Sequence, residues 1–202
     1  MATTTDDRVR TGHVTQTTPY AWPWNGVLDA TRTAVLVVDP AGAGVIDGDE
    51  LRNAEAVVAT LQRAGGVAIR VLTRRASSTR PLGDAASAFV AEGAGEIPTD
   101  VTVTSQGVDG FFGSSLESVL RRARIERLLL LGGWLETSVH STMRTANDMG
   151  FECLLVVDAC VPGDVELVAN SVSMIEMSGG IFGAVGATAR VVEAYAQEGV
   201  GA

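Results

Sequence analysis

The sequence predicts one α/β domain: a three-layer sandwich on a mainly parallel sheet of about six strands, of the Rossmann-like class. Apolar runs of strand length alternate with helical patterns along most of the 202 residues. The apolar runs are nearly continuous, which is typical of parallel strands covered by helices on both faces. Hydrophobic residues make up 46% of the chain and charged residues 19%, so one substantial core is expected.

The elements follow in a regular order, each bounded by polar or turn-forming residues. Gly65 and Gly150 directly follow two of the predicted helices, where glycine commonly ends a helix. Right-handed crossovers are expected to place helices on both faces of the sheet. The predicted strands are Ala34–Asp39, Val67–Thr73, Val101–Thr104, Leu128–Leu131, Cys153–Asp158 and Ile181–Val185. The predicted helices are Glu50–Ala64, Ser115–Ala123, Thr137–Met149, Val165–Met177 and Ala187–Gln197.

Three segments fall outside this alternation. Residues 1–18 are polar and rich in threonine, so a mobile N-terminal arm is predicted, with the single domain spanning residues 19–202. The segment Pro19–Trp24 holds two prolines and three aromatic residues. We expect it to be extended and to lay its rings on the domain or on a neighbouring subunit. The patternless segment Ala76–Gly95 is long enough to cover a binding site as a lid.

Composition excludes several classes of partner. The 15 basic residues, all arginine, and 24 acidic residues leave a net charge of −9, which disfavours nucleic acid and anionic membrane surfaces. The start of the chain lacks a secretory pattern, and the longest apolar stretch is too short for a membrane helix. The two cysteines show no CxxC spacing. We therefore expect a reduced cytoplasmic protein that binds neither nucleic acid nor membrane.

Candidate site residues follow the strands, because ligands of such sheets bind beyond the carboxyl ends of the strands. Asp39 ends the first apolar strand, and a carboxylate placed there is either hydrogen-bonded or functional, since burying an unpaired charge is costly. Catalysis and the capping of the next turn both remain open for it. The other candidates are Arg74–Arg75, Ser105–Gln106, Gly132–Trp134 and Asp158–Cys160.

Four stretches carry a resemblance to a known family: PYAWPWNGVLDATRTAVLVVD, VDGFFGSSLESVLRRARIERLLLLGG, LETSVHSTMRTANDMGFECLLVVDAC and GGIFGAV. The chain resembles the isochorismatase-like cysteine hydrolases, especially the amidohydrolase branch that acts on biuret and related ureides. The resemblance covers nearly all of the chain from Pro19 onward. It implies a three-layer α/β fold, assembly as a dimer or tetramer, and hydrolysis by an Asp, a Lys and a Cys at the carboxyl ends of strands.

The same resemblance implies an altered site. Asp39 stands at the position of the catalytic Asp, but Ser105 replaces the Lys and Ser138 replaces the Cys. The family's D-M-Q-x-D-F signature has become DPAGAG at residues 39–44. This removes its glutamine and the second aspartate, which helps to bind metal in the nicotinamidase branch. We therefore expect neither a metal nor a cofactor.

The physical chemistry of these replacements disfavours hydrolysis through a covalent intermediate. A serine hydroxyl needs a general base, and His140 lies two residues from Ser138, on a different face of a helix. Without a lysine beside it, Asp39 is expected to hold a proton more readily and to act as a general acid/base on a small, largely neutral molecule. The alternatives are a pseudoenzyme or scaffold partner of an active hydrolase, and a Ser138-dependent hydrolase. Cys160 as a relocated nucleophile is disfavoured, because small cysteines near strand ends are usually buried and inert.

The residues around the expected nucleophile position are the candidate ligand-binding groups. The turn Trp134–Ser138 is expected to present backbone N–H groups to the ligand. In the family this turn forms an oxyanion hole, with a non-proline cis peptide that would fall at Trp134–Leu135. The candidate substrate-binding residues are Trp134, Leu135, Glu136, Thr137, Phe111, Gln106 and His140. Pro19–Trp24 is the expected anchor of a homo-oligomer.

Overall fold

The computed structural model describes residues 9–40, 48–74 and 97–196, and in these a six-stranded sheet has the order β5-β4-β3-β6-β7-β8. Every neighbouring pair in this sheet is parallel, which confirms the predicted α/β class. The strands are β3 (Thr33–Pro40), β4 (Val67–Thr73), β5 (Val101–Thr104), β6 (Arg127–Gly133), β7 (Glu152–Val161) and β8 (Ala184–Gly186).

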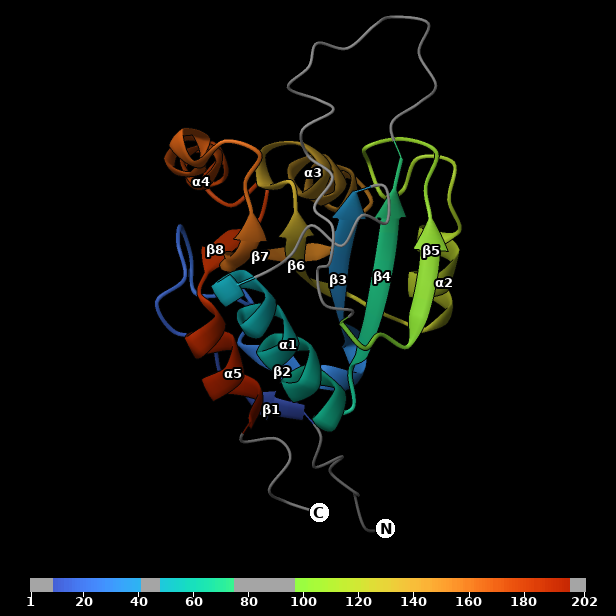
Figure 1. Cartoon of the computed structure of the whole chain (residues 1–202). Helices are drawn as coiled ribbons and strands as arrows, with labels where there is room; N and C mark the ends of the chain where they lie inside the picture. Colours follow the sequence, from blue (N-terminus) through green and yellow to red (C-terminus); the bar gives the residue numbers. More distant parts are fainter. Residues whose placement is uncertain (1–8, 41–47, 75–96, 197–202) are drawn as a thin grey trace, which may run out of the picture.

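Helices cover both faces of the sheet. Figure 1 shows α1 (Gly48–Arg63) and α5 (Thr188–Ala196) in front of the sheet, in contact with each other. Behind it lie α2 (Leu116–Arg122) and α3 (His140–Asp148), while α4 (Val168–Glu176) lies at the β8 edge. Two predicted helices begin with a different helical turn: a π turn at Leu135–Val139 leads into α3, and a 3-10 turn at Val165–Leu167 leads into α4.

The order in which the chain adds strands to the sheet reverses between β3 and β6. The chain passes from β3 outward through β4 to β5, then returns to place β6 on the other side of β3. Such a reversal leaves a crevice at the carboxyl ends of the two central strands, which is where doubly wound sheets bind ligands. Asp39 ends one of these strands, and the turn at Leu135–Val139 follows the other.

The two central strands pack so closely that one position requires glycine. Leu128–Leu131 are fully buried, which explains why this strand reads as a continuous apolar run. Gly132 has φ +122°, and a Cβ added there would lie 2.1 Å from the carbonyl oxygen of Val38. This close approach holds the turn after β6 directly beside the end of β3.

The structure corrects the prediction for the N-terminal residues. Val9–Thr11 form β1, which pairs antiparallel with β2 (Val27–Asp29), and Val14 is fully buried. Residues 9–18 are therefore part of the domain, because their backbone pairing and apolar anchors hold them there; residues 1–8 lie outside the described range.

Within Pro19–Trp24 the two tryptophans differ. Trp22 is buried in the core of its own domain, whereas Trp24 is 73% exposed. Trp22 therefore packs on its own domain, one of the two surfaces expected for these rings.

Two further predictions concern the last strand and the expected lid. The last strand is shorter than predicted and begins at Ala184, with Ile181 exposed in the preceding turn. The expected lid, Ala76–Gly95, lies outside the described residues. No helix in the described ranges is long and apolar enough to cross a membrane.

Candidate functional site

Asp39 is paired with an arginine from the neighbouring strand. Arg70 of β4 donates from Nε to Asp39 Oδ2 at 2.9 Å and donates to the same oxygen from Nη2. The Asp39 side chain is 5% exposed and that of Arg70 22%. In the sheet Asp39 lies opposite Leu72, two residues beyond Arg70, so both side chains point to the same face.

This pair corrects the expectation that Asp39 lacks a neighbouring cation. The chain contains no lysine, but the guanidinium of Arg70 takes the place beside the carboxylate. The two N–H bonds that Arg70 donates to Oδ2 are charge-assisted hydrogen bonds, which are stronger than those between neutral groups. Asp39 therefore has a cationic partner from β4 in place of the lysine of the family pattern.

Ser138 is buried and its hydroxyl is bound by a neighbouring hydroxyl. Thr73, the last residue of β4, donates from Oγ1 to Ser138 Oγ at 3.2 Å. The main-chain oxygen of Ser138 accepts from Thr142 Oγ1 at 2.7 Å, one turn further along α3. Among the residues the structure describes, no carboxylate or imidazole contacts the Ser138 hydroxyl. The geometry thus provides no general base for Ser138 in this part of the chain.

His140 points away from Ser138. Its Nδ1 accepts a hydrogen bond of 3.1 Å from Nε of Arg144, and the Arg144 guanidinium in turn stacks on the ring of Phe182. Burial of the ring, and then the positive charge of Arg144, lower the pKa of His140; the nearby backbone of Ser171 opposes them more weakly. His140 is a neutral residue and makes no hydrogen bond to Ser138 or Ser105, the two serines at the candidate site.

Ser105 lies at the end of β5, and its hydroxyl is used locally. It is fully buried and donates to the carbonyl oxygen of Gly107 at 2.7 Å, while its backbone N–H donates to Leu72 and extends the pairing with β4. Gln106 is exposed beside it. Phe111 stacks on Phe151 at 6.2 Å between ring centroids. Because Phe151 directly precedes β7, at the opposite end of the sheet, Phe111 belongs to the core and not to a ligand-facing wall.

The turn after β6 differs from the family expectation. In the described chain the cis peptides are Thr18–Pro19 and Trp22–Pro23, so Trp134–Leu135 is trans. Thr137 and Val139 both donate their backbone N–H to the carbonyl oxygen of Trp134, which closes the π turn. Leu135 is buried in the core, whereas Trp134 is half-buried and Thr137 exposed. Trp134 and Thr137 are thus the side chains of this turn that a ligand can reach.

Glu136 positions the turn rather than facing a ligand. Its two carboxylate oxygens accept backbone N–H bonds from Gly163 at 3.0 Å and Asp164 at 3.1 Å. These residues belong to the loop between β7 and α4. The carboxylate therefore fastens the turn after β6 to the neighbouring loop.

Other strand-end candidates have structural roles. Asp158 Oδ1 accepts from the backbone and the hydroxyl of Thr188, and so caps α5. Cys160 is buried with its thiol on the carbonyl oxygen of Val156, and burial raises its pKa far above the usual range of a thiol. An un-ionised, buried thiol is not a nucleophile. Arg74 is exposed after β4.

Arg70 and Thr73 are the two site residues that sequence reasoning missed. Both lie in the strand VAIRVLT, where an arginine interrupts an otherwise apolar run. That interruption was a usable signal, because a charge within a buried strand requires a partner. The register of β3, β4 and β5 places Asp39, Leu72 and Thr104 in one row, with Thr73 and Ser105 one position further. The expected positions thus do gather at one end of the sheet.

Metal ions are held by sets of converging donor side chains. In the described ranges no three His, Cys, Asp or Glu side chains converge. At the adjoining ends of β3 and β4, the described residues pair the carboxylate of Asp39 with the guanidinium of Arg70.

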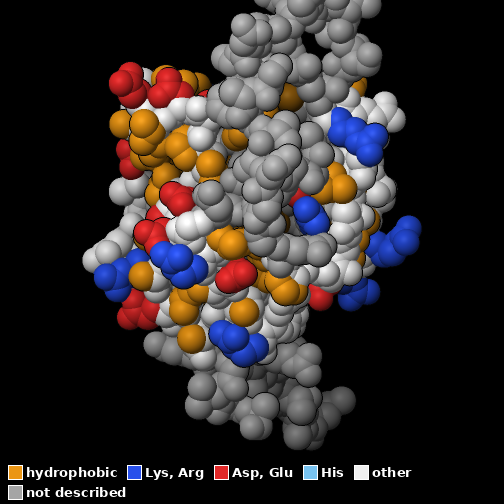
Figure 2. All heavy atoms as spheres, in the orientation of Figure 1, with side chains coloured by type: hydrophobic (Ala, Val, Ile, Leu, Met, Phe, Trp, Pro, Cys, Tyr) orange, Lys and Arg blue, Asp and Glu red, His pale blue; other side chains and the backbone are white. Residues whose placement is uncertain are grey.

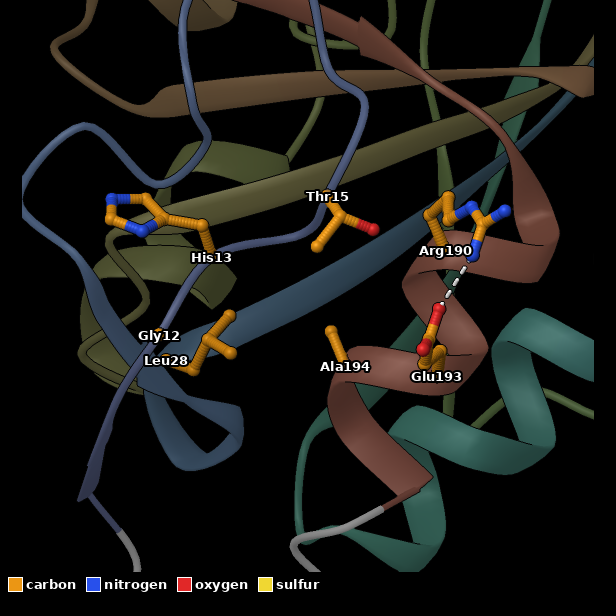
Figure 3. A pocket seen from close by; sticks show the side chains of 7 residues that line it. All are labelled: Gly12, His13, Thr15, Leu28, Arg190, Glu193 and Ala194. Atoms are coloured by element: carbon orange, nitrogen blue, oxygen red, sulfur yellow. Dashed lines mark hydrogen bonds and ion pairs between the residues drawn. The ribbon is translucent and has the colours of Figure 1, made fainter.

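A separate hollow lies at the opposite end of the sheet. Figure 3 shows it between the paired strands β1 and β2 and helix α5. Its volume is near 200 Å³. Arg190, on its wall, is already bound by Glu193 at 2.8 Å and by Gln16 at 2.9 Å. This pairing leaves little charge for an anion, so the hollow is not a second candidate site. Its lining is Gly12, His13, Thr15, Leu28, Arg190, Glu193 and Ala194.

The chain thus has a doubly wound parallel sheet with a carboxylate beside the point where the strand order reverses, which is where sheets of this class bind ligands. The isochorismatase domain model matches residues 33–194, and the chain belongs to the isochorismatase family. An isochorismatase family protein of Escherichia coli O157:H7, YecD, is 27% identical over 168 residues, which cover 73% of this chain and 89% of that protein.

Solved structures share the fold. A cysteine hydrolase from Pseudomonas syringae pv. phaseolicola 1448A superposes with a TM-score of 0.65 at 19% identity, covering 85% of this chain and 95% of that one. N-carbamoylsarcosine amidase from Thermoplasma acidophilum superposes with a TM-score of 0.57 at 16% identity, covering 78% and 96% of the two chains. At these identities the likeness concerns the fold.

Proposed function

We propose that this chain is a cofactor-free enzyme of the isochorismatase family that uses Asp39 as its acid/base group. The observation that carries this proposal is the Asp39–Arg70 ion pair at the carboxyl end of β3, beside the reversal point of the sheet. The guanidinium holds the carboxylate at the strand end, and in this proposal the carboxylate starts the reaction as a base. It takes a proton from the substrate, or from a water bound to the substrate, and returns it to the product.

The substrate proposed is a small and largely neutral molecule. The carboxylate and the guanidinium cancel each other's charge, and Ser138, Thr73 and Ser105 add only uncharged hydroxyl groups. A site of this kind binds groups that donate and accept hydrogen bonds better than it binds a free charge. Trp134 and Thr137 are the side chains of the adjoining turn that would contact such a molecule.

Ser138 serves in this proposal as an orienting group. It stands where the resemblance places the family's nucleophilic cysteine, yet its hydroxyl accepts from Thr73 and contacts no base among the described residues. Its own proton is then directed to an acceptor on the ligand, such as a carbonyl oxygen. The same geometry disfavours the alternative of a Ser138-dependent hydrolase.

A pseudoenzyme or scaffold partner of an active hydrolase is the second candidate. The observation that favours it is that Asp39 and Arg70 satisfy each other, as structural ion pairs do. Such a protein would bind a ligand or a partner protein without turnover, and every substitution at the pair would change stability alone.

The experiment is a turnover screen with matched variants. The panel holds neutral amides, ureides, lactones and enol ethers, with biuret, nicotinamide and N-carbamoylsarcosine as amides expected to stay intact. With the substrate found, Asp39→Asn is expected to lower kcat by about 10²-fold or more, as removal of a general base does. Ser138→Ala is expected to lower it by about five- to tenfold, the value of one hydrogen bond.

The control is Asp29→Asn, a buried aspartate just before β3 whose carboxylate accepts from Thr31. It should lower stability and leave kcat unchanged. Full activity in Asp39→Asn, or an acyl group found on Ser138 by mass spectrometry, would overturn the proposal. A panel that yields binding but no turnover, together with a partner protein recovered in pull-downs, would establish the pseudoenzyme.

A further inference from the structure

The polar groups beside the altered site positions are ordered inside the domain rather than on its surface. Figure 2 shows arginine and acidic side chains interspersed over the lower half of one face of the molecule. Inside the domain, by contrast, Thr73, Ser138 and Thr142 are buried, and the hydroxyl group of each takes part in a hydrogen bond. Burying a hydroxyl is costly unless it is hydrogen-bonded, so such a set fixes the groups that it joins.

The hydroxyl of Thr142 holds two segments of the chain at once. It donates to the main-chain oxygen of Ser138, one helical turn earlier, at 2.7 Å. A threonine within a helix commonly makes a bond of this kind. The same hydroxyl oxygen also accepts the backbone N–H of Gly110 at 2.9 Å, and Gly110 belongs to the loop between β5 and α2. Thr142 is fully buried, so both bonds are shielded from water.

The loop approaches Thr142 so closely that position 110 has no room for a side chain. A Cβ added to Gly110 would lie 2.7 Å from Cγ1 of Val71 in β4 and 3.1 Å from the Thr142 hydroxyl oxygen. The loop begins directly after β5 with Ser105, which stands where the family resemblance places a lysine. Ser138 stands where it places a cysteine. Thr142 therefore joins the segments that carry these two positions.

We propose that Thr142 is a positioning residue of the site, which sets where the hydroxyl of Ser138 lies. This rests on the proposed function, in which Ser138 orients the substrate. Thr73 holds the side chain of Ser138 at 3.2 Å, and Thr142 holds its main chain, so the residue is fixed from two sides. Without the Thr142 hydroxyl, the buried N–H of Gly110 loses its partner, and the loop moves or admits water to satisfy it. Ser138 then loses its fixed direction toward a ligand.

The first test is a double-mutant cycle in turnover of the substrate that the panel yields. Thr142→Val keeps the shape of the side chain, removes its hydroxyl, and is expected to lower kcat by about three- to tenfold. In the Ser138→Ala background the same substitution should change kcat by less than about twofold, because Thr142 acts through Ser138. Thr142→Ser restores the hydroxyl and should restore kcat. Should Thr142→Val not fold, Thr142→Ala takes its place, since it leaves room for a water at the N–H of Gly110.

The matched control is Thr145→Val. Thr145 lies three residues further along α3, and its hydroxyl binds the same loop by donating to Asp109 Oδ2 at 2.8 Å. The control therefore removes one bond between this helix and the loop without touching Ser138, so it should lower stability and leave kcat unchanged. An equal fall of kcat for Thr142→Val in both backgrounds, or an equal fall for Thr145→Val, would show that only loop stability matters. Either result would overturn the role of Thr142 while the proposed function stands.

A second test needs no substrate. Ser138→Cys places a thiol in the buried position, and mass spectrometry follows its labelling by iodoacetamide. A buried thiol reacts when its segment opens locally, so adding Thr142→Val should raise the labelling rate by about fivefold or more, and adding Thr145→Val by less than about twofold. An unchanged rate with Thr142→Val would overturn the proposal. If no compound of the panel is turned over, the proposed function fails, and the labelling rates still decide whether Thr142 positions residue 138.

Discussion

Arg70 and Asp39 come from adjacent parallel strands, and the guanidinium holds one carboxylate oxygen by two N–H bonds. The strand register aligns Arg70 with Val37, so the arginine side chain reaches forward along the sheet to the strand end. A chain without lysine thus carries a cation beside its strand-end carboxylate. The cation comes from the middle of β4 rather than from the end of β5, where the family resemblance placed it.

The ion pair itself can be tested by stability measurements. Arg70→Met should lower the free energy of unfolding by about 2–4 kcal/mol, because it leaves a buried carboxylate without its cation. Arg74→Met removes the same charge from an exposed position four residues further and should change stability by less than about 0.5 kcal/mol. Urea unfolding measures both. Asp39→Asn combined with Arg70→Met should recover part of the loss, and strict additivity of the two would contradict a direct pair.

The pH dependence of stability should report on His140. The pKa of His140 is lowered in the folded protein from its usual value of 6.5, so the unfolded chain binds the proton more readily. Its contribution is fully present above that value and is lost as the pH falls below it. His140→Gln should therefore flatten the fall in stability between pH 6.5 and lower pH, as followed by thermal unfolding.

His13→Gln is the matched control, because His13 is exposed. Burial raises the pKa of Glu152, so the contribution of Glu152 to stability changes with pH in the opposite direction from that of His140. It is lost as the pH rises. Only the difference between each variant and the wild type is therefore compared. An unchanged slope in His140→Gln would contradict the assignment.

Neither native cysteine should react with thiol reagents. Cys153 and Cys160 are both buried, and burial raises the pKa of each thiol, so little thiolate forms at neutral pH. Iodoacetamide should leave turnover intact and should label both residues only after denaturation. Ser115→Cys, at an exposed position, provides a positive control for the reagent. Loss of activity on labelling of Cys160 in the folded protein would show that this cysteine acts at the site.

Gly132→Ala should be among the most damaging single substitutions. The added Cβ would lie 2.1 Å from the Val38 carbonyl oxygen, and the residue has φ +122°. A clash with backbone cannot relax cheaply, so a loss of about 4 kcal/mol or more is expected. Gly150→Ala is the control: its φ is +84°, but nothing lies within 4 Å of the new Cβ, so only backbone strain of about 1–2 kcal/mol remains. Equal losses of stability in the two variants would show that backbone strain alone, and not the clash with Val38, accounts for the effect of Gly132→Ala.

Local sequence patterns were sufficient for the sheet and most helices. The runs at Val67–Thr73 and Val101–Thr104 form strands with the predicted bounds, and both are rich in β-branched residues, which favour strands. The alternation with helices predicted parallel strands, whose carboxyl ends lie at one end of the sheet, and this placed Asp39 and the turn after β6 there. Local patterns did not show that residues 9–18 belong to the domain, because Val14 is a single buried apolar residue in a polar stretch without periodicity.

Tertiary structure alone decided the chemistry around Asp39. Its partner lies 31 positions away along the chain, and only the parallel register of β3 and β4 brings the two charges together. The packing of the turn after β6 against the end of β4 sets Thr73 against Ser138, so the hydroxyl at the nucleophile position is paired with another hydroxyl. Composition and periodicity report how a segment buries itself, since burial depends on the residue type. Which polar group meets which depends on strand order and register, and these are properties of the folded chain.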